Sequence, residues 1–522
     1  MQLAAIDLFI IAGYAVGIVS LATWVSRETR GHQKNTQDYF LAGKTLPWWA
    51  IGASLIAANI SAEQIIGMSG SGYVIGLAIA SYEWMSAITI IIVGKYFLPI
   101  FLKHNIYTMP QFLEQRYDRR VCMLLAVFWL GVYVFVNLTS ILWLGTLAIN
   151  SVTGLNYVYG LILLGLMALA YSLYGGLKAI ALTDIIQVIL LVFGGLLISF
   201  LSLQAISQGE GVITGFVELM NRAPEKFDLI LTPDNPHYIS LPGISVLVGG
   251  MWIMNLSYWG FNQYIIQRAL AARSLQEAQK GIAFAAYLKL LMPVIVVLPG
   301  IAAVILAPGL AAPDQAYPEM MKLVPAGLRG LVFAALIAAI LSSIGSMVNS
   351  ISTISTMDIY RHIRVGASEK HLVIIGRSIS FIALVLGMIC AKPLLGNFDQ
   401  AFQYIQEFTG FFTPGIVVIF LLGMFWKGMT SYGALAAALS SALLSFLFKM
   451  FWPTLPFIDR VGLVFLLCIV IAAGISVFSR PGQQDQGIAI DHQNISYVTT
   501  SAFNTAAIGV ILILIALYAT WW

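Results

Sequence analysis

Fourteen apolar stretches, each long enough to cross a lipid bilayer, follow one another along nearly all of the 522 residues. A membrane-crossing helix needs about 20 predominantly apolar residues. Charged residues make up only 10% of the chain, against about 25% in soluble domains. The sequence therefore predicts an all-α integral membrane protein with about 14 transmembrane helices. The stretches are 5–25, 47–76, 79–102, 121–149, 155–174, 179–204, 241–267, 279–307, 326–357, 374–392, 399–425, 430–450, 458–479 and 502–521.

The positions of lysine and arginine orient these helices. If the N-terminus lies outside, 19 of the 27 basic residues fall in or beside cytoplasmic loops. Cytoplasmic loops of membrane proteins carry such an excess. No basic segment precedes the first apolar stretch, so it does not resemble a cleaved signal. We expect an even number of helices, with both termini on the outer side.

Composition and spacing argue against several other classes of protein. Cys122, Cys390 and Cys468 form neither a disulfide framework nor a metal-binding spacing. The sequence has no basic, aromatic-rich stripe for nucleic acid and no recognisable catalytic constellation. We expect one transmembrane domain over 1–522, with the lipid bilayer as a partner, no nucleic acid and no enzymatic activity. The oligomeric state stays open.

Two apolar stretches are interrupted by polar and small residues. The second contains Asn59, Ser61 and Gln64, followed by several glycines, and the seventh contains Asn255, Ser257 and a glycine. An opened helix at membrane depth is tolerated only where its backbone lines a cavity or binds an ion. Close packing through small residues explains each segment equally well. The two lie five helices apart, as broken helices do in transporters built from inverted repeats.

Further polar residues lie at membrane depth in other stretches, where each is a functional candidate. With Gln64 and Asn255 they offer amides, hydroxyls, a carboxylate and an ammonium, which together suit a polyhydroxylated ring. Tyr258 adds a flat apolar face. For each residue taken alone, an ordinary interhelical hydrogen bond is the competing interpretation. These residues are Glu83, Ser86, Asn137, Lys289 and Gln406.

The ninth stretch carries a row of hydroxyl and amide side chains between Ser342 and Thr353. Hydroxyl and carbonyl oxygens are hard ligands that suit a small hard cation. Facing the opened second helix, Ser342 and Ser343 would form a sodium site with backbone oxygens. Hydroxyl-to-backbone bonds within a packed helix are the alternative. The backbone oxygens proposed for this site belong to Ala57, Ile60 and Ala339.

Several runs of sequence resemble the solute:sodium symporter family, including its bacterial sugar carriers, over nearly the whole chain. Runs of this length are specific, whereas a single short motif would not be. The runs are 39–44 (YFLAGK), 52–59 (GASLIAAN), 61–64 (SAEQ), 258–260 (YWG), 267–268 (QR) and 402–406 (FQYIQ).

The resemblance implies a five-plus-five inverted-repeat transporter (LeuT-like) with an extra helix at 5–25. The repeats would be 47–204 and 241–425, followed by three helices in 430–521. It implies sodium-coupled import of a hexose, galactose or glucose, across a bacterial inner membrane. The sodium residues named above would bind the ion, and Asp184 would assist its exit. Sugar contacts would come from Gln64, Glu83, Ser86, Asn137, Asn255, Lys289 and Gln406, an inner gate from Tyr258 and Trp259, and an outer gate from Met68, Tyr82 and Phe402.

Ser257 departs from the resemblance, because sugar-carrying relatives usually have an aromatic residue there. This departure leaves the exact sugar open but not the class of carrier. Independently of Ser257, an amino acid, a polyol or a nucleoside is an alternative substrate. Proton coupling through Glu83 or Asp184 is a further alternative to sodium. From other classes, a channel would pass current far above transporter rates, and a sensor would carry a soluble output domain, which the sequence does not show.

Overall fold

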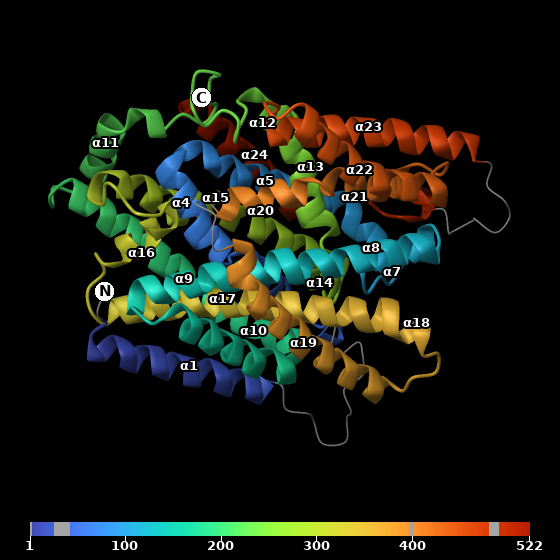
Figure 1. Cartoon of the computed structure of the whole chain (residues 1–522), viewed down its shortest axis with the longest axis horizontal. Coiled ribbons are helices and arrows are strands. Elements are labelled where there is room, and N and C mark those ends of the chain that lie inside the picture. Colours follow the sequence, from blue (N-terminus) through green and yellow to red (C-terminus); the bar gives the residue numbers. More distant parts are fainter. Residues whose placement is uncertain (1–2, 26–41, 396–400, 480–489) are drawn as a thin grey trace.

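Helices make up most of the structure, a computed structural model that describes residues 3–25, 42–395, 401–479 and 490–522 (Figure 1). Within these ranges nine helices are long and apolar enough to cross a membrane, or ten if one bent pair counts as a single span. The expectation of an all-α membrane protein is confirmed. Most of the loop predicted at 26–46, with the start of the 39–44 run, lies outside the described residues.

Most of the described α-helices fall on the predicted stretches, and four short ones lie between them. They are α1 (Ala5–Val25), α3 (Trp48–Asn59), α4 (Met68–Val74), α5 (Ser81–Ile92), α6 (Leu98–Lys103), α7 (Met109–Arg116), α8 (Arg119–Val132), α9 (Thr139–Thr153), α10 (Tyr157–Ile206), α11 (Val212–Arg222), α12 (Ile244–Val248), α13 (Gly250–Leu256), α14 (Gln263–Leu270), α15 (Leu275–Leu306), α16 (Ala316–Met321), α17 (Leu328–Thr353), α18 (Arg361–Ile363), α19 (Glu369–Leu395), α20 (Ala401–Gly410), α21 (Thr413–Phe425), α22 (Ser431–Phe451), α23 (Phe457–Phe478) and α24 (Ser501–Thr520).

Each of the fourteen predicted stretches falls on helical structure, but several boundaries differ. Helix α10 covers both 155–174 and 179–204, with separate apolar parts at Tyr157–Leu169 and Thr183–Ile206. The stretch 399–425 is divided into α20 and α21. The number fourteen therefore stays a prediction.

The second stretch is bent by 61° between α3 and the helix that resumes at Glu63. The backbone leaves the helix at Ile60, whose ψ is 85°. The Ser61 N–H then donates to the Asn59 carbonyl, and the Ser61 hydroxyl accepts from the Glu63 N–H. Asn and Ser side chains and short turns of this kind compete with the helical ladder. The predicted opening near Asn59 to Ser61 is confirmed.

Helix α15 packs along both halves of this bent helix through glycines. A Cβ added at Gly281 would lie 2.7 Å from the carbonyl oxygen of Trp48 in α3. One added at Gly300 would lie 2.1 Å from the carbonyl oxygen of Ser69 in α4. Glycine therefore sets how closely these backbones approach. Lys289, between the two glycines in the chain, reaches Asn59 at the bend.

The seventh stretch is also discontinuous. A π-helical turn, Ser257–Phe261, follows α13, and the extended residue Asn262 separates it from α14. A second interruption at Gly249 separates α12 from α13. The predicted interruption of this stretch is confirmed.

The first helix, α1, is fastened to α17 at its start. The Asp7 carboxylate accepts hydrogen bonds from the N–H groups of Gly327 (2.7 Å) and Gly330 (2.8 Å). A carboxylate at a helix N-terminus satisfies its free N–H groups and its dipole. Asp7 of one helix thus caps another, and α1 lies at the edge of the bundle beside α17 and α10 (Figure 1).

Candidate functional site

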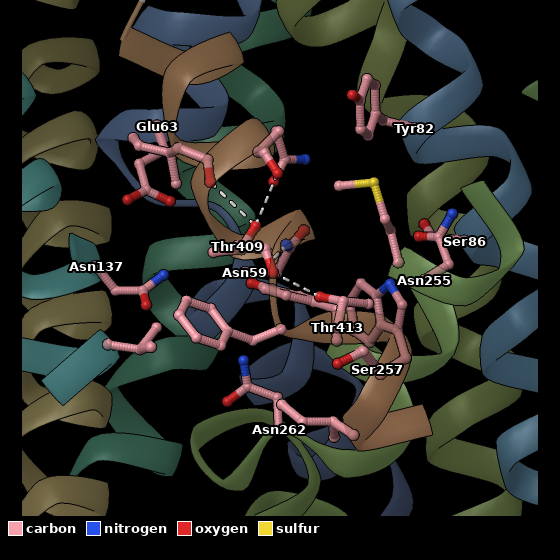
Figure 2. A pocket seen from close by; sticks show the side chains of 18 of the residues that line it. Asn59, Glu63, Tyr82, Ser86, Asn137, Asn255, Ser257, Asn262, Thr409 and Thr413 are labelled. Carbon is pink, nitrogen blue, oxygen red and sulfur yellow. Dashed lines mark hydrogen bonds between the residues drawn. The ribbon is translucent and has the colours of Figure 1, made fainter. Parts of the chain in front are cut away.

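A cavity lies where the two discontinuous helices approach each other in the middle of the bundle. Figure 2 shows Asn137 and Glu63 on one side of it and Tyr82, Ser86 and Asn255 on the other. All seven residues predicted to contact a sugar line this cavity, and they come from elements far apart in the sequence. They are Gln64, Glu83, Ser86, Asn137, Asn255, Lys289 and Gln406.

Three π-helical turns direct side chains into the cavity. The turn Glu63–Gly67 carries Gln64, and the turn Tyr133–Leu138 carries Asn137. The turn Ser257–Phe261 carries Tyr258 and Trp259. A π-turn inserts one extra residue into a helix and is frequent at functional sites. Sequence periodicity alone does not reveal these turns.

A buried network crosses the cavity wall around Lys289. Its ammonium donates to the Glu83 carboxylate and to the Asn59 side-chain oxygen. It also lies 5.0 Å from the centre of the Trp259 ring. The Gln64 amide donates to the other Glu83 oxygen at 3.2 Å. Lys289 thus has the carboxylate partner that its depth in the membrane requires.

Several polar atoms beside the cavity are left without a protein partner among the described residues. They include the Gln64 oxygen, the Asn255 nitrogen and the Tyr82 hydroxyl. A buried polar group without a hydrogen bond costs about 1–3 kcal/mol. The hydroxyl groups of a bound ligand would form hydrogen bonds with these atoms and so remove this cost.

Tyr258 is held from two sides. Its hydroxyl accepts from the Asn59 amide at 3.0 Å and from the Tyr264 hydroxyl at 2.7 Å. The Trp259 ring lies edge-on to it, with ring centres 5.3 Å apart. Tyr258 therefore joins the bend of the second helix to α14, and Trp259 contacts both Tyr258 and Lys289.

Two of the three residues predicted for the outer gate are in contact with each other. The rings of Tyr82 and Phe402 meet edge to face, with centres 5.4 Å apart, and both line the cavity. Met68 is buried at the start of α4 and is not among the residues that line it.

Ser343 lies at the carbonyl groups that the bend exposes. Its hydroxyl is 3.3 Å from the Ala58 oxygen and 3.5 Å from the oxygens of Ala57 and Ile60. One hydroxyl proton satisfies one acceptor, so at least two of these oxygens gain nothing from Ser343. A cluster of carbonyl and hydroxyl oxygens in a buried place is the ligand chemistry of sodium.

Ser342, the neighbouring serine, has a different partner. Its hydroxyl donates to Asp184, which also accepts from the Ser54 hydroxyl at 2.5 Å. The Arg268 guanidinium lies 3.7 Å from the same carboxylate, and both side chains are fully buried. Ala339, one turn earlier on α17, is buried. Of the residues predicted for sodium, the structure thus gathers Ala57, Ile60 and Ser343 at one point and turns Ser342 toward Asp184.

The rest of the hydroxyl row on α17 bonds to α14. Ser346 accepts from Arg268, and Ser350 donates to Gln267 at 3.1 Å. The Thr353 hydroxyl lies 3.5 Å from the Gln267 amide nitrogen. These contacts fasten α14 to α17. Ser346 and Thr353 also donate to the carbonyls of Ser342 and Asn349 within α17, which is the hydroxyl-to-backbone bonding of the alternative interpretation.

Several cavity residues were not singled out from the sequence, among them Tyr133, Glu63, Thr409 and Thr413. Tyr133 donates to the Asn262 side chain at 2.5 Å. Glu63, Thr409 and Thr413 also line the cavity (Figure 2). Such residues give no signal of their own when they stand alone in an apolar stretch. A single helical position reveals neither the direction in which the side chain points nor its partner.

Comparisons with known proteins agree with this architecture. The model of the Sodium:solute symporter family matches residues 39–440. The chain is 49% identical to the sodium/glucose cotransporter of Vibrio parahaemolyticus, over the whole of this chain and 99% of that one. It is 33% identical to the sodium/myo-inositol cotransporter 2 of Mus musculus, over 84% of this chain and 69% of that one.

Two solved structures share the fold. A sodium-coupled sialic acid symporter, in a substrate-bound outward-open state, matches with a TM-score of 0.80 and 22% identity, over 92% of this chain and 99% of that one. Mhp1, a nucleobase-cation-symport-1 family transporter in a closed conformation, matches with a TM-score of 0.54 and 13% identity, over 91% and 99%. At these identities the likeness concerns the fold, which is that of LeuT-like transporters.

Proposed function

The chain belongs to the sodium:solute symporter family, and from this premise we propose that it imports a hexose, galactose or glucose, with sodium by alternating access. The observation that carries the proposal is the meeting of two sites at one bend. Carbonyl oxygens exposed around Ile60 surround Ser343. On the same bent helix, Asn59 and Gln64 reach into the cavity.

A neutral solute fits the charges of the cavity. Among the described lining residues, the charged side chains are Lys289, Glu83 and Glu63. Lys289 is already neutralised by Glu83. An anionic substrate would find no unpaired cation among these residues, whereas the hydroxyl groups of a neutral solute match the amides and carboxyl groups of the wall. The proposed sugar contacts are the seven polar residues predicted from the sequence.

Binding of sodium would couple to binding of the solute through the bend. An ion held by Ala57, Ile60, Ala339, Ser342 and Ser343 would fix the second helix against α17. The same helix presents Asn59 to Lys289 and Tyr258. Ligands move a conformational equilibrium only by binding its two states unequally. The proposed inner gate is Tyr258, supported by Trp259, and the proposed outer gate is Tyr82 and Phe402, with Met68 behind them.

The free energy available is sufficient for accumulation. One charge crossing about 100 mV supplies about 2.3 kcal/mol, and a tenfold sodium gradient adds about 1.4 kcal/mol. At one-to-one coupling the two together would hold roughly a 500-fold sugar gradient.

The proposed location is a bacterial inner membrane, with both termini on the outer side and repeats at 47–204 and 241–425. Two contacts support this orientation. The Leu229 N–H, in the predicted outer loop, donates to the Trp521 carbonyl near the C-terminus. Asp7, near the N-terminus, accepts a hydrogen bond from Gly327, which lies at the start of the ninth predicted stretch, at its proposed outer end. Asp184 is the residue proposed to assist sodium exit.

A cyclic polyol is the second candidate substrate, because relatives at 33% identity carry the name sodium/myo-inositol cotransporter 2. Ser257, which lines the cavity in place of an aromatic residue, leaves more room for a different ring.

Uptake into proteoliposomes tests the proposal. Labelled galactose, glucose, myo-inositol and proline are offered with and without an inward sodium gradient. We expect galactose or glucose to accumulate only with sodium. Uptake of proline but of neither sugar, or sugar uptake driven by a pH gradient without sodium, would refute the proposal.

A further inference from the structure

A second cavity lies at the edge of the bundle, between α1, α10 and α17, and has a volume of about 350 Å³. Its lining is largely aliphatic and includes Ala334, Ala338 and Leu341 on one face of α17. Within the described residues none of the lining side chains is charged. This cavity shares no lining residue with the one around Lys289.

Two polar side chains in this cavity have buried atoms without a hydrogen-bond partner among the described residues. Gln187 is only 1% exposed, yet neither its amide nitrogen nor its oxygen has a hydrogen bond among the described residues. The Tyr14 hydroxyl, on the facing helix α1, is also without one. Buried side-chain amides and hydroxyls are normally bonded. Together these groups offer both donors and acceptors to something inside the cavity.

The cavity is bounded by helices that are held together. Asp7 fastens the start of α1 to α17, so the two helices are anchored beside the opening rather than free to close or separate there. Val16, which lines the cavity from α1, is 67% exposed. Since α1 lies at the edge of the bundle (Figure 1), the way in is from the side, where the surrounding lipid would be.

The size and chemistry of the cavity define its occupant. An apolar cavity of about 150 Å³ stays dry and binds benzene, and this one is more than twice as large. A water molecule beside Gln187 would leave the aliphatic remainder empty. A carboxylate end group is unfavourable, because none of the described lining residues carries a positive charge that would pair with it. An uncharged hydroxyl on an aliphatic chain satisfies both parts of the cavity.

We propose that this cavity is a binding site for an uncharged aliphatic amphiphile with a hydroxyl end group, entering from the membrane. The hydroxyl bonds to Gln187 and Tyr14, and the chain lies against Ala334 and Ala338 of α17. The site stands apart from the solute cavity, so it does not depend on which solute is carried.

Photolabelling of the full chain in proteoliposomes tests this site, with a diazirine analogue of 1-decanol as the probe. We expect saturable labelling of peptides from α1 and α17, displaced by 1-decanol and at least fivefold less well by decanoate. Ala334→Phe, which fills the cavity, should reduce labelling at least fivefold. Ala442→Phe, on a half-buried face of α22, should leave it unchanged.

Two further variants test the site even if Ala334→Phe does not fold. Val16→Trp blocks the opening from an exposed position and should reduce labelling to a similar extent. Gln187→Leu keeps the approximate size of the side chain but removes its amide. In this variant the ability of 1-decanol to displace the probe, relative to that of decane, should fall about tenfold. Non-saturable labelling, or full labelling in folded Val16→Trp protein, overturns the proposal. Equal displacement of the probe by decane and decanol in the wild type does so too.

Discussion

Two buried ion pairs lie within this bundle, and they differ in what surrounds them. Lys289 and Glu83 are in direct contact, yet both line the solute cavity, beside polar atoms that have no protein partner. Arg268 and Asp184 are 3.7 Å apart and enclosed by Ser54, Ser342 and Ser346.

The difference concerns what each pair is able to do. Arg268 also donates to the carbonyls of Ser54 and Tyr264, so its hydrogen bonds join α3, α14 and α17. Arginine, with five donors in a planar fork, suits such a junction. Lys289 has a compact ammonium with rotatable donors, which suits an exchange of partners when a ligand enters. The enclosed pair fastens helices, and the pair in the cavity is available to a solute.

The largest effect is expected for Arg268→Ala, which leaves Asp184 buried without its cation. Removing one member of a buried pair costs about 3–5 kcal/mol. The variant should lose most of its folded yield, or its melting temperature should fall sharply, as measured by fluorescence-detected size exclusion after heating. Arg273→Ala, at an exposed position, is the control. An unchanged melting temperature would mean that the enclosed pair does not fasten the bundle.

Lys289→Ala should abolish solute uptake, by about 100-fold or more, while the protein still inserts. The cavity would lose the ammonium that positions Glu83 and Asn59. Initial uptake rates in proteoliposomes are compared with those of Lys280→Ala, half-exposed on the same helix. Gln64→Ala should have the same effect, because the cavity loses an amide that donates to Glu83 and whose oxygen has no partner among the described residues. Wild-type uptake by either variant would remove the cavity around Lys289 from the proposed mechanism.

Ser343→Ala should raise the sodium concentration for half-maximal uptake about tenfold. A ligand oxygen is lost from the group formed with Ala57 and Ile60, and tenfold corresponds to about 1.4 kcal/mol. Ser378→Ala, on an exposed part of α19, should leave the sodium curve unchanged. If both variants have the same curve, Ser343 is not a sodium ligand.

The smallest effect is expected for Tyr258→Phe. It removes the hydroxyl that joins Asn59 to Tyr264 but keeps the ring. A net hydrogen bond contributes about 0.5–1.5 kcal/mol, so the apparent affinity for the solute should change about three- to tenfold. Tyr432→Phe, at an exposed position, serves as the comparison. A loss of uptake as complete as in Lys289→Ala would show that the hydroxyl does more than join the two segments.

Much of this arrangement was predictable because a chain that crosses the bilayer must do so in apolar helices of limited length. Apolar stretches of bilayer length located the helices, and polar residues at membrane depth located the cavity. Asn59, Ser61 and a run of small residues indicated the bend of the second helix. Gln64 and Lys289, 225 positions apart, were grouped because neither is tolerated in lipid without a reason.

Other features depend on three-dimensional contacts that one chain position does not reveal. Asp184 and Arg268 were each noticed, but their pairing, with the Ser54 hydroxyl bonded to both, needed the packing of α3, α10 and α14. Tyr133 gave no signal, because the sequence pattern around a tyrosine in an apolar stretch is the same whether its side chain faces lipid, another helix or a cavity. The capping of α17 by Asp7 joins residues more than 300 positions apart.

The central claim is that the bend binds a cation and a neutral ring together, and reciprocal binding tests it most directly. Galactose affinity is measured by scintillation proximity on the purified protein at several sodium concentrations, and sodium affinity at several galactose concentrations. Coupled equilibria require each ligand to change the affinity for the other by the same factor. We predict a factor of about 5–150 in both directions, the usual range for coupled sites. A galactose affinity independent of sodium would contradict the account.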